Sequence, residues 1–224
     1  TPRAVLDAGS LTALRTGAAG GLAVDLLARR DARTVALIGC GVQGAKQLEA
    51  VRCVRDIDRI LCVDSDEKTA VALVDTIRRS AEPCTCEVCP SADEAVAQAD
   101  IVITATPSPT PTFDSRNLKA GAHVTALGSY QPHTQEVDAA LVKRAYVVAE
   151  HRESADREAG DLILADASAD AVLGQIVLGE APGRTDDEQL TLFKSVGVAV
   201  QDTAAAAWVL EQAEERGVGQ LVEL

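Results

Sequence analysis

The chain has 224 residues, enough to bury a substantial core, and it carries 21 Lys and Arg against 34 Asp and Glu, a net charge of −13. Because the acidic residues are scattered along the whole chain, nucleic acid and anionic membranes are unsuitable partners. No apolar run reaches the length of a membrane span, and the first residues lack the pattern of a signal peptide, so we expect a cytoplasmic protein.

The first predicted element is a long helix with Ser10 as its N-cap, reaching Arg30. Its apolar face is formed by Leu11, Leu14, Ala18, Leu22 and Leu26. Glycines at 17, 20 and 21 would let another backbone or a ligand approach closely. Arg15 is one turn away, and its side chain could either bind a phosphate or lie in solvent beside a helix contact.

A glycine-rich turn follows the next predicted strand, Val35–Ile38. Glycines at 39, 41 and 44 form the pattern G-x-G-x-x-G, and a helix is predicted from Val42 to Arg55. The first glycine permits the turn, the second lets backbone amides approach a pyrophosphate, and the third lets the helix pack on the strand. The positive end of the helix would then face the phosphates.

An acidic residue ends the second predicted strand, Ile60–Val63. Asp64 has the spacing from the glycine turn that is expected of a ribose-binding carboxylate, about 20 residues. Its charge would repel a 2′-phosphate, and Ser65 and Asp66 supply no arginine to bind one. The stretch therefore predicts an NAD site, with an ordinary tight turn between strand and helix as the alternative.

A cysteine cluster follows a helix predicted over residues 67–79. Cys84, Cys86 and Cys89 could ligate a metal, but Cys84 and Cys86 alternate on a predicted strand, no histidine is near, and a fourth ligand would have to come from elsewhere. We therefore expect these cysteines to act as small apolar residues in the packing of the strand, and we predict no metal site.

Two polar loops follow the next predicted strands. A helix over 91–98 leads to the strand Ile101–Thr104, which is followed by Thr106, and a strand over 123–127 ends in Gly128-Ser-Tyr130. Ligands of open parallel sheets bind beyond the carboxyl ends of strands, so we expect Thr104 and Thr106 to touch the cofactor and the second loop to carry substrate chemistry.

The remaining elements complete an α/β pattern. We expect a helix over 138–144, a strand over 146–149, acidic and mostly helical chain over 153–171, and a helix over 171–179. A solvated turn over 183–188, a strand over 190–195 and a helix over 198–215 follow. This alternation predicts a doubly wound parallel sheet with flanking N- and C-terminal helices.

Together these motifs resemble the ornithine cyclodeaminase and mu-crystallin family, with its archaeal-type alanine dehydrogenases and ketimine reductases. The resemblance runs from about Ala4 to Gly219. It rests on the stretches 6–19, 39–43, 104–107, 128–138 and 183–197. It implies a Rossmann NAD(P)-binding fold in which the cofactor is contacted by Arg15, Val42, Gln43, Asp64, Thr106, Gly128 and Ser195.

The resemblance also implies a domain organisation. Family members have an N-terminal substrate and dimerisation domain that carries a catalytic lysine and a carboxylate-binding arginine. This sequence contains no methionine and begins at Thr1, so we expect it to start inside a longer, homodimeric protein. Residues 1–30 would connect from that domain, residues 31–195 would form the NAD-binding domain, and residues 196–224 would return toward the absent domain.

One position departs from the cyclodeaminases, which carry an aspartate in the loop where this chain has Tyr130. Tyrosine titrates at about 10 and could donate a proton or hydrogen bond but would be a poor base. We therefore expect an NAD-dependent oxidoreductase that acts on the C–N bond of an amino or imino acid, with Tyr130 as the candidate catalytic residue. Asp138, another possible base, is predicted to be a helix N-cap. The alternatives are an ornithine or lysine cyclodeaminase and a non-catalytic module that binds NAD or another small ligand.

Overall fold

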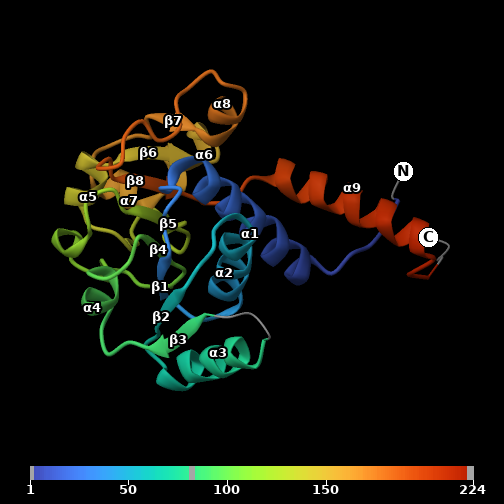
Figure 1. The fold of residues 1–224 in the computed structure, drawn as a ribbon. Coiled ribbons are helices and arrows are strands. Elements are labelled where there is room, and N and C mark those ends of the chain that lie inside the picture. The colour runs from blue at the N-terminus through green and yellow to red at the C-terminus, as the bar shows by residue number, and fades with distance from the viewer. Residues whose placement is uncertain (1–2, 81–83, 221–224) are drawn as a thin grey trace.

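The computed structural model describes residues 3–80 and 84–220. Within them eight strands form one sheet (Figure 1). The strands are β1 (Thr34–Ile38), β2 (Arg59–Val63), β3 (Thr85–Val88), β4 (Ile101–Thr104), β5 (His123–Ala126), β6 (Tyr146–Ala149), β7 (Ala171–Val172) and β8 (Thr191–Lys194). Apolar residues predominate in β1, β2, β4 and β6, which is typical of strands that are covered on both faces, whereas β3 has exposed residues at Thr85 and Glu87.

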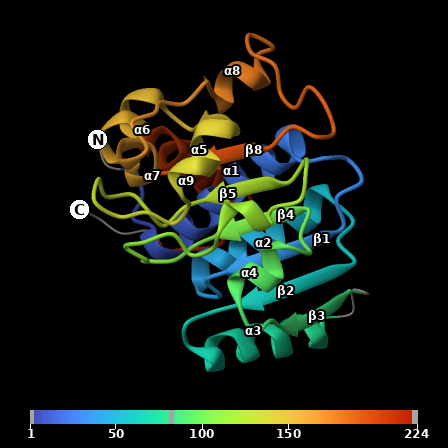
Figure 2. The same ribbon diagram turned by 90° about the vertical axis from the view of Figure 1, so that its left-hand side faces the viewer.

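The strand order is β3-β2-β1-β4-β5-β8-β6-β7, and all neighbours pair in parallel. From β1 the chain proceeds outward to β3 and then returns past β1 to add β4 on its other side. In Figure 2, β3 and α3 lie at one end of the sheet and α8 lies at the other. The direction of winding reverses between β1 and β4, as in doubly wound folds, which confirms the predicted fold class.

Helices cover both faces of the sheet. They are α1 (Ala8–Leu27), α2 (Val42–Val54), α3 (Glu67–Arg79), α4 (Ala92–Val96), α5 (Ala139–Arg144), α6 (Arg152–Glu158), α7 (Gly160–Leu164), α8 (Leu173–Val177) and α9 (Ala199–Arg216), with a 3-10 turn, η1 (Ser115–Asn117). Side chains alternate along each strand. In β1, Val35 and Leu37 pack with α1, α2 and α3, whereas Ala36 and Ile38 pack with α4, α5 and α7.

The first helix differs from its predicted ends. Its N-cap is Asp7, whose carboxylate accepts from the amides of Gly9 and Ser10 at 2.8 and 3.4 Å, so Ser10 was wrongly predicted as the cap. The helix ends at Leu27, where the buried guanidinium of Arg55 donates to the carbonyls of residues 24, 25 and 28. The C-cap residue of α2 thus satisfies carbonyls at the end of α1.

The glycine cluster of α1 is a helix contact. A Cβ on Gly17 would lie 2.9 Å from the carbonyl oxygen of Lys46, and one on Gly21 would lie 2.9 Å from the Cβ of Ala50. Both neighbours belong to α2, so the two helices approach more closely than larger residues would allow. This close packing places the N-terminal part of α1 beside the N-terminal end of α2 and the glycine-rich turn.

The final helix, α9, extends away from the sheet past α1 (Figure 1). None of its residues is fully buried, and Trp208 is 57% exposed. On α1, Leu14 and Leu22 are also partly exposed, at 48% and 41%. No described helix is both long enough and apolar enough to cross a membrane.

Two other regions refine the sequence prediction. The chain over 153–171 contains two short helices, α6 and α7. In the segment predicted as a helix over 171–179, the first two residues form the strand β7, and the helix α8 follows them. Cys86, on β3, is buried with its Sγ 3.9 Å from that of Cys62 on β2. Pro83, next to the cysteine cluster, lies outside the described residues.

Candidate functional site

The glycine-rich turn connects β1 to α2. Gly39 has a φ of +94°, and a Cβ there would lie 2.5 Å from the carbonyl oxygen of Ala105; a Cβ on Gly44 would lie 2.0 Å from the carbonyl oxygen of Gly39. By contrast, a Cβ on Gly41 would meet no atom within 4 Å. Two glycines are therefore required by the protein's own packing, and the middle one leaves open space, as predicted for a turn that receives a phosphate.

The N-terminus of α2 opens onto this space. Gly41 is its N-cap and has no side chain to bind the first amides of the helix, and Val42 is 70% exposed. The first N–H groups of a helix have no partner within the helix, and they carry a partial positive charge. A pyrophosphate at Gly41 would satisfy them.

Asp64 lies immediately beside the turn. Its Oδ2 accepts from the amide of Cys40 at 2.7 Å, and its Oδ1 accepts from the amide of Asp66 at 2.9 Å. A carboxylate can accept about four hydrogen bonds, so lone pairs remain for a ligand. Because β1 and β2 are parallel neighbours, the glycine turn and Asp64 lie at the same edge of the sheet, and the hydrogen bond from Cys40 joins them.

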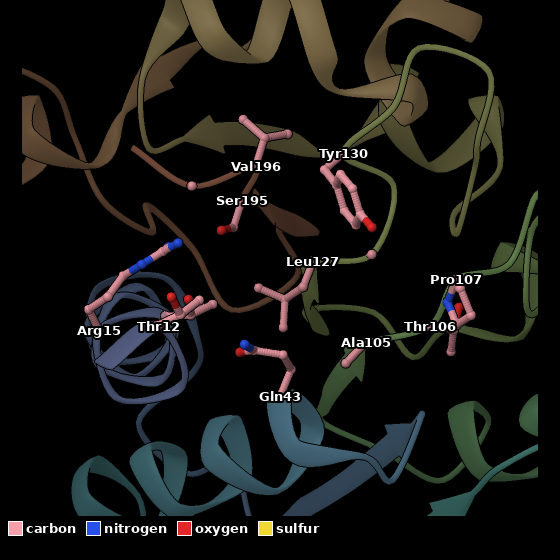
Figure 3. A pocket seen from close by; sticks show the side chains of 13 residues that line it. Thr12, Arg15, Gln43, Ala105, Thr106, Pro107, Leu127, Tyr130, Ser195 and Val196 are labelled. Carbon is pink, nitrogen blue, oxygen red and sulfur yellow. The ribbon is translucent and has the colours of Figure 1, made fainter. Parts of the chain in front are cut away.

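A cavity of about 470 Å³ adjoins the turn (Figure 3). It is lined by Thr12, Arg15 and Thr16 of α1, Gln43 of α2, and residues that follow three strands: Ala105, Thr106 and Pro107 after β4, Leu127, Gly128 and Tyr130 after β5, and Ser195, Val196 and Gly197 after β8. These strands lie next to one another, and the cavity is at their carboxyl ends where the winding reverses. This is where open α/β sheets bind ligands.

Six of the predicted site residues line the cavity. They are Arg15, Gln43, Thr106, Gly128, Tyr130 and Ser195. In Figure 3 the side chains of Arg15 and Tyr130 approach the cavity from opposite sides. The others belong to the turn or its surroundings: Gly39, Gly41, Val42, Gly44 and Asp64. Thr104, the last residue of β4, is fully buried and does not line the cavity.

Two of these residues have side-chain oxygens without a protein partner. In the described part of the chain, Oε1 of Gln43 and Oγ1 of Thr104 are buried and make no hydrogen bond. Buried polar atoms are nearly always paired, so such atoms need an explanation. Gln43 faces the cavity, and a ligand there would supply the missing partner (Figure 3).

Arg15 is held at the rim of the cavity by α9. Its Nε donates to Asp202 at 3.0 Å and its Nη1 to Gln201 at 3.4 Å, and the side chain is only 13% exposed. Gln201 in turn donates to Glu150, which also accepts from the amide of Gly197 at 2.7 Å. A guanidinium has five N–H donors, so Arg15 keeps some available for a phosphate while α9 fixes its position.

A buried ion pair lies beneath the loop that carries Tyr130. Nζ of Lys194 is 2.9 Å from Oδ2 of Asp161 and donates to Oγ of Ser129 at 2.7 Å, and the Ser129 hydroxyl donates to Asp161. All three residues are fully buried. Ser129 and Lys194 lie in stretches that carry the family resemblance, but the sequence indicated no role for any of the three. The one available signal was a lysine within the apolar strand Leu192–Lys194.

These features define a Rossmann-type dinucleotide-binding fold with a cavity between the loops after β4, β5 and β8. The family model described as "Ornithine cyclodeaminase/mu-crystallin family" matches residues 1–217. The chain belongs to the ornithine cyclodeaminase/mu-crystallin family.

Individual relatives agree with this assignment. A Delta(1)-pyrroline-2-carboxylate reductase of Bacillus cereus is 41% identical over 230 residues, covering 99% of this chain and 70% of the relative. Among solved structures, the Thermococcus litoralis Delta(1)-pyrroline-2-carboxylate reductase, in complex with NADH and L-proline, has a TM-score of 0.92 and 34% identity, over 95% of this chain and 68% of that one. An archaeal alanine dehydrogenase dimer with bound NAD has a TM-score of 0.94 and 35% identity, over 100% of this chain and 71% of that one.

Proposed function

We propose that this chain forms the cofactor-binding part of an NAD-dependent oxidoreductase that acts on the C–N bond of an amino or imino acid. The observation that carries the proposal is one cavity that reaches from Gln43, in the first turn of α2, to Tyr130 on the loop after β5. The named relatives reduce a cyclic imino acid or dehydrogenate alanine, so they share chemistry at a carbon that bears both nitrogen and a carboxylate.

The residues present fit the cofactor. The open space at Gly41 and the first amides of α2 would receive the pyrophosphate, Arg15 would add a charge-assisted hydrogen bond to it, and Asp64 would accept from the ribose hydroxyls. When bound, NAD supplies the two-electron oxidation or reduction of the C–N bond. Gln43 would bind a polar group of the ligand with its unpaired oxygen.

The protein's own part in the chemistry would come from the loops around the cavity. Ala105, Pro107 and Leu127 contribute apolar surface to the cavity, which would help to exclude water once the ligands are bound. Tyr130, on the opposite side from Arg15, would donate a hydrogen bond or proton to the reacting nitrogen or carboxylate (Figure 3). A small imino acid carboxylate is the substrate class that we propose.

The cofactor assignment is tested by titrating the unmodified protein with NADH and NADPH while following cofactor fluorescence. NADH should bind more tightly, because a 2′-phosphate would lie against the Asp64 carboxylate. Asp64→Ala should weaken NADH binding by about 1.5–3 kcal/mol, the value of hydrogen bonds to a charged group, and narrow the preference. Asp66→Asn, which alters the neighbouring cap of α3, is the matched control and should keep the preference. Equal affinity for both cofactors in the unmodified protein would contradict the NAD assignment.

The reaction is tested with 1-pyrroline-2-carboxylate and NADH in one assay, and with ornithine and NAD in another. Loss of NADH absorbance with the cyclic imine supports the reductase. Release of ammonia from ornithine without net formation of NADH would instead identify a cyclodeaminase. NADH binding with neither reaction would favour a binding module.

We also propose that the protein is a homodimer. Leu14 and Leu22 of α1 and Trp208 of α9 are large apolar residues that are at least 41% exposed, and contiguous exposed apolar surface is typical of interaction sites. The archaeal alanine dehydrogenase is described as a dimer. Light scattering measures the mass in solution, and a monomer at all concentrations would contradict this proposal.

A further inference from the structure

One fully buried carboxylate joins two of the loops that line the cavity. Oε1 of Glu136 accepts from the backbone amide of Thr106 at 2.6 Å and from its hydroxyl at 2.8 Å. Oε2 accepts from the backbone amide of Gly128. Thr106 follows β4 and Gly128 follows β5, and both line the cavity, whereas Glu136 itself does not. A single side chain behind the cavity therefore connects the loop after β4 to the loop after β5.

The two loops are in direct contact at this point. A Cβ on Gly128 would lie 1.8 Å from the carbonyl oxygen of Thr106 and 2.8 Å from Oε1 of Glu136. Real Cβ atoms do not approach other atoms so closely, so only glycine fits between the loop and the carboxylate. The spacing of the walls is thus fixed by contact as well as by hydrogen bonds.

The main chain of Glu136 is anchored as well. Its carbonyl oxygen accepts from the amide and the hydroxyl of Thr112, at 2.9 and 3.1 Å, and so holds the far end of the loop that begins at Thr106. Its amide donates to Oδ1 of Asp161 at 2.7 Å, and Asp161 is paired with Lys194. The carboxylate is therefore presented from a rigid, buried base.

The negative charge of Glu136 is not neutralised by an ion pair with any of the described residues. Among residues 3–80 and 84–220, no lysine, arginine or histidine forms an ion pair with it. Burying a carboxylate is costly unless hydrogen bonds compensate, and here all the compensation comes from Thr106 and Gly128. A glutamine of the same size could accept from only one of the two loops, because its second terminal atom is a donor and would face an N–H group.

We propose that Glu136 is a positioning residue: it holds the Thr106 and Gly128 loops in the arrangement that receives the nicotinamide end of the cofactor and the substrate. This inference rests on the proposed function. Glu136 acts through Thr106 and Gly128, since it is fully buried and separated from the cavity by them.

The test compares Glu136→Gln with Asp138→Asn, two substitutions of the same chemistry placed two residues apart. Asp138 likewise accepts from an amide and a hydroxyl of one residue, Ser115, at 2.9 and 2.7 Å, and from a second amide, Leu141, at 2.8 Å. It caps α5, as the sequence predicted, and it does not line the cavity. Both variants lose acceptors for buried or half-buried donors, but only Glu136→Gln loosens the cavity walls.

NADH affinity is measured by fluorescence at a temperature where both variants are folded. Glu136→Gln should bind NADH roughly tenfold more weakly, which corresponds to the loss of one hydrogen bond to a charged group, while Asp138→Asn binds like the unmodified protein. If the enzyme is active, KM for the imino acid should also rise in Glu136→Gln. Unchanged NADH affinity in Glu136→Gln would overturn the proposal, and so would an equal loss in both variants. Failure of the unmodified protein to bind NADH would instead refute the proposed function.

A second measurement needs neither a variant nor a cofactor. Amide hydrogen exchange of the unmodified protein should show slow exchange at Thr106 and Gly128, because both amides donate to Glu136. Fast exchange at either amide, on the timescale of exposed loops, would show that the carboxylate does not join the loops and would overturn the proposal, even if Glu136→Gln fails to fold.

Discussion

The two sides of the cavity are built in different ways. On the side of β1 and β2, the site is made by backbone: Gly39 and Gly44 allow a turn, Gly41 leaves space, and one carboxylate, Asp64, binds the turn. On the side of β5 and β8, the loops rest on buried polar side chains, including Glu136, Asp161 and Lys194. The first side needs glycine at set spacings in one stretch of chain. The second needs partners that only the folded structure brings together.

This difference matters for how each side tolerates change. The glycines of the turn carry no charged side chain, so a substitution there acts through steric contact. A buried ion pair is costly to break, because the remaining partner stays buried without a counter-charge. We therefore expect the largest losses of stability from the second side and the most selective losses of cofactor binding from the first.

Lys194→Met should have the largest effect on stability. It removes the counter-charge of Asp161 and leaves that carboxylate fully buried, which costs about 3–5 kcal/mol in comparable pairs. Urea unfolding followed by circular dichroism measures the loss. Lys119→Met is the matched control: Lys119 pairs with Asp100 at 3.0 Å, but its side chain is 41% exposed, so water can replace the lost partner. Similar losses of unfolding free energy in the two variants would show that the buried pair contributes no more to stability than the exposed one.

Gly44→Ser and Gly41→Ser should separate packing from binding on the first side. A Cβ at Gly44 would lie 2.0 Å from the carbonyl oxygen of Gly39, so we expect overpacking to cost about 1–3 kcal/mol. A Cβ at Gly41 meets nothing, and serine is a favourable N-cap, so stability should be retained while NADH binding weakens. Thermal unfolding and cofactor fluorescence measure the two effects. The reverse assignment of effects, with Gly44→Ser stable and Gly41→Ser unfolded, would contradict the geometry of the turn.

The same contrast explains what the sequence could predict. The glycine spacing, Asp64 and the alternation of apolar strands with helices are local patterns, so the fold and the candidate cofactor turn could be read from them. The network around Asp161 could not, because Ser129, Asp161 and Lys194 are 32 and 33 residues apart along the chain, and no local pattern records which buried polar residues will meet. Glu136 lies within a recognised motif, yet its role becomes visible only when Thr106 and Gly128 are seen on either side of it. The end of α1 was misplaced for a similar reason, since carbonyls there are bound by Arg55, which is 31 residues from Val24 along the chain.

The pH dependence of stability should show a smaller effect, which comes from a buried histidine at the other edge of the sheet. His123, the first residue of β5, is fully buried at the edge of the sheet opposite the cavity, where burial and then the charges of Arg184 and Arg55 lower its pKa to about 3. Its Nδ1 is 2.8 Å from Oγ1 of Thr191, and that hydroxyl donates to the carbonyl of Leu27. Thr191 therefore accepts from an Nδ1–H group, and the imidazole is neutral, with Nε2 accepting from Thr125.

Because the pKa is lower in the folded state than in the unfolded chain, the unfolded state binds a proton first as the pH falls. Stability from the neutral imidazole is fully present above about pH 6.5 and is lost progressively as the pH falls toward the folded pKa of about 3. At one unit below the unfolded pKa the loss is about 1.4 kcal/mol. His123→Gln should be less stable at pH 7 but should lack this slope, whereas His133→Gln, an exposed control, should keep it. Urea unfolding at pH 7 and pH 5.5 measures the difference. An equal slope in His123→Gln would show that the buried histidine does not govern stability in this range and that the carboxylates do.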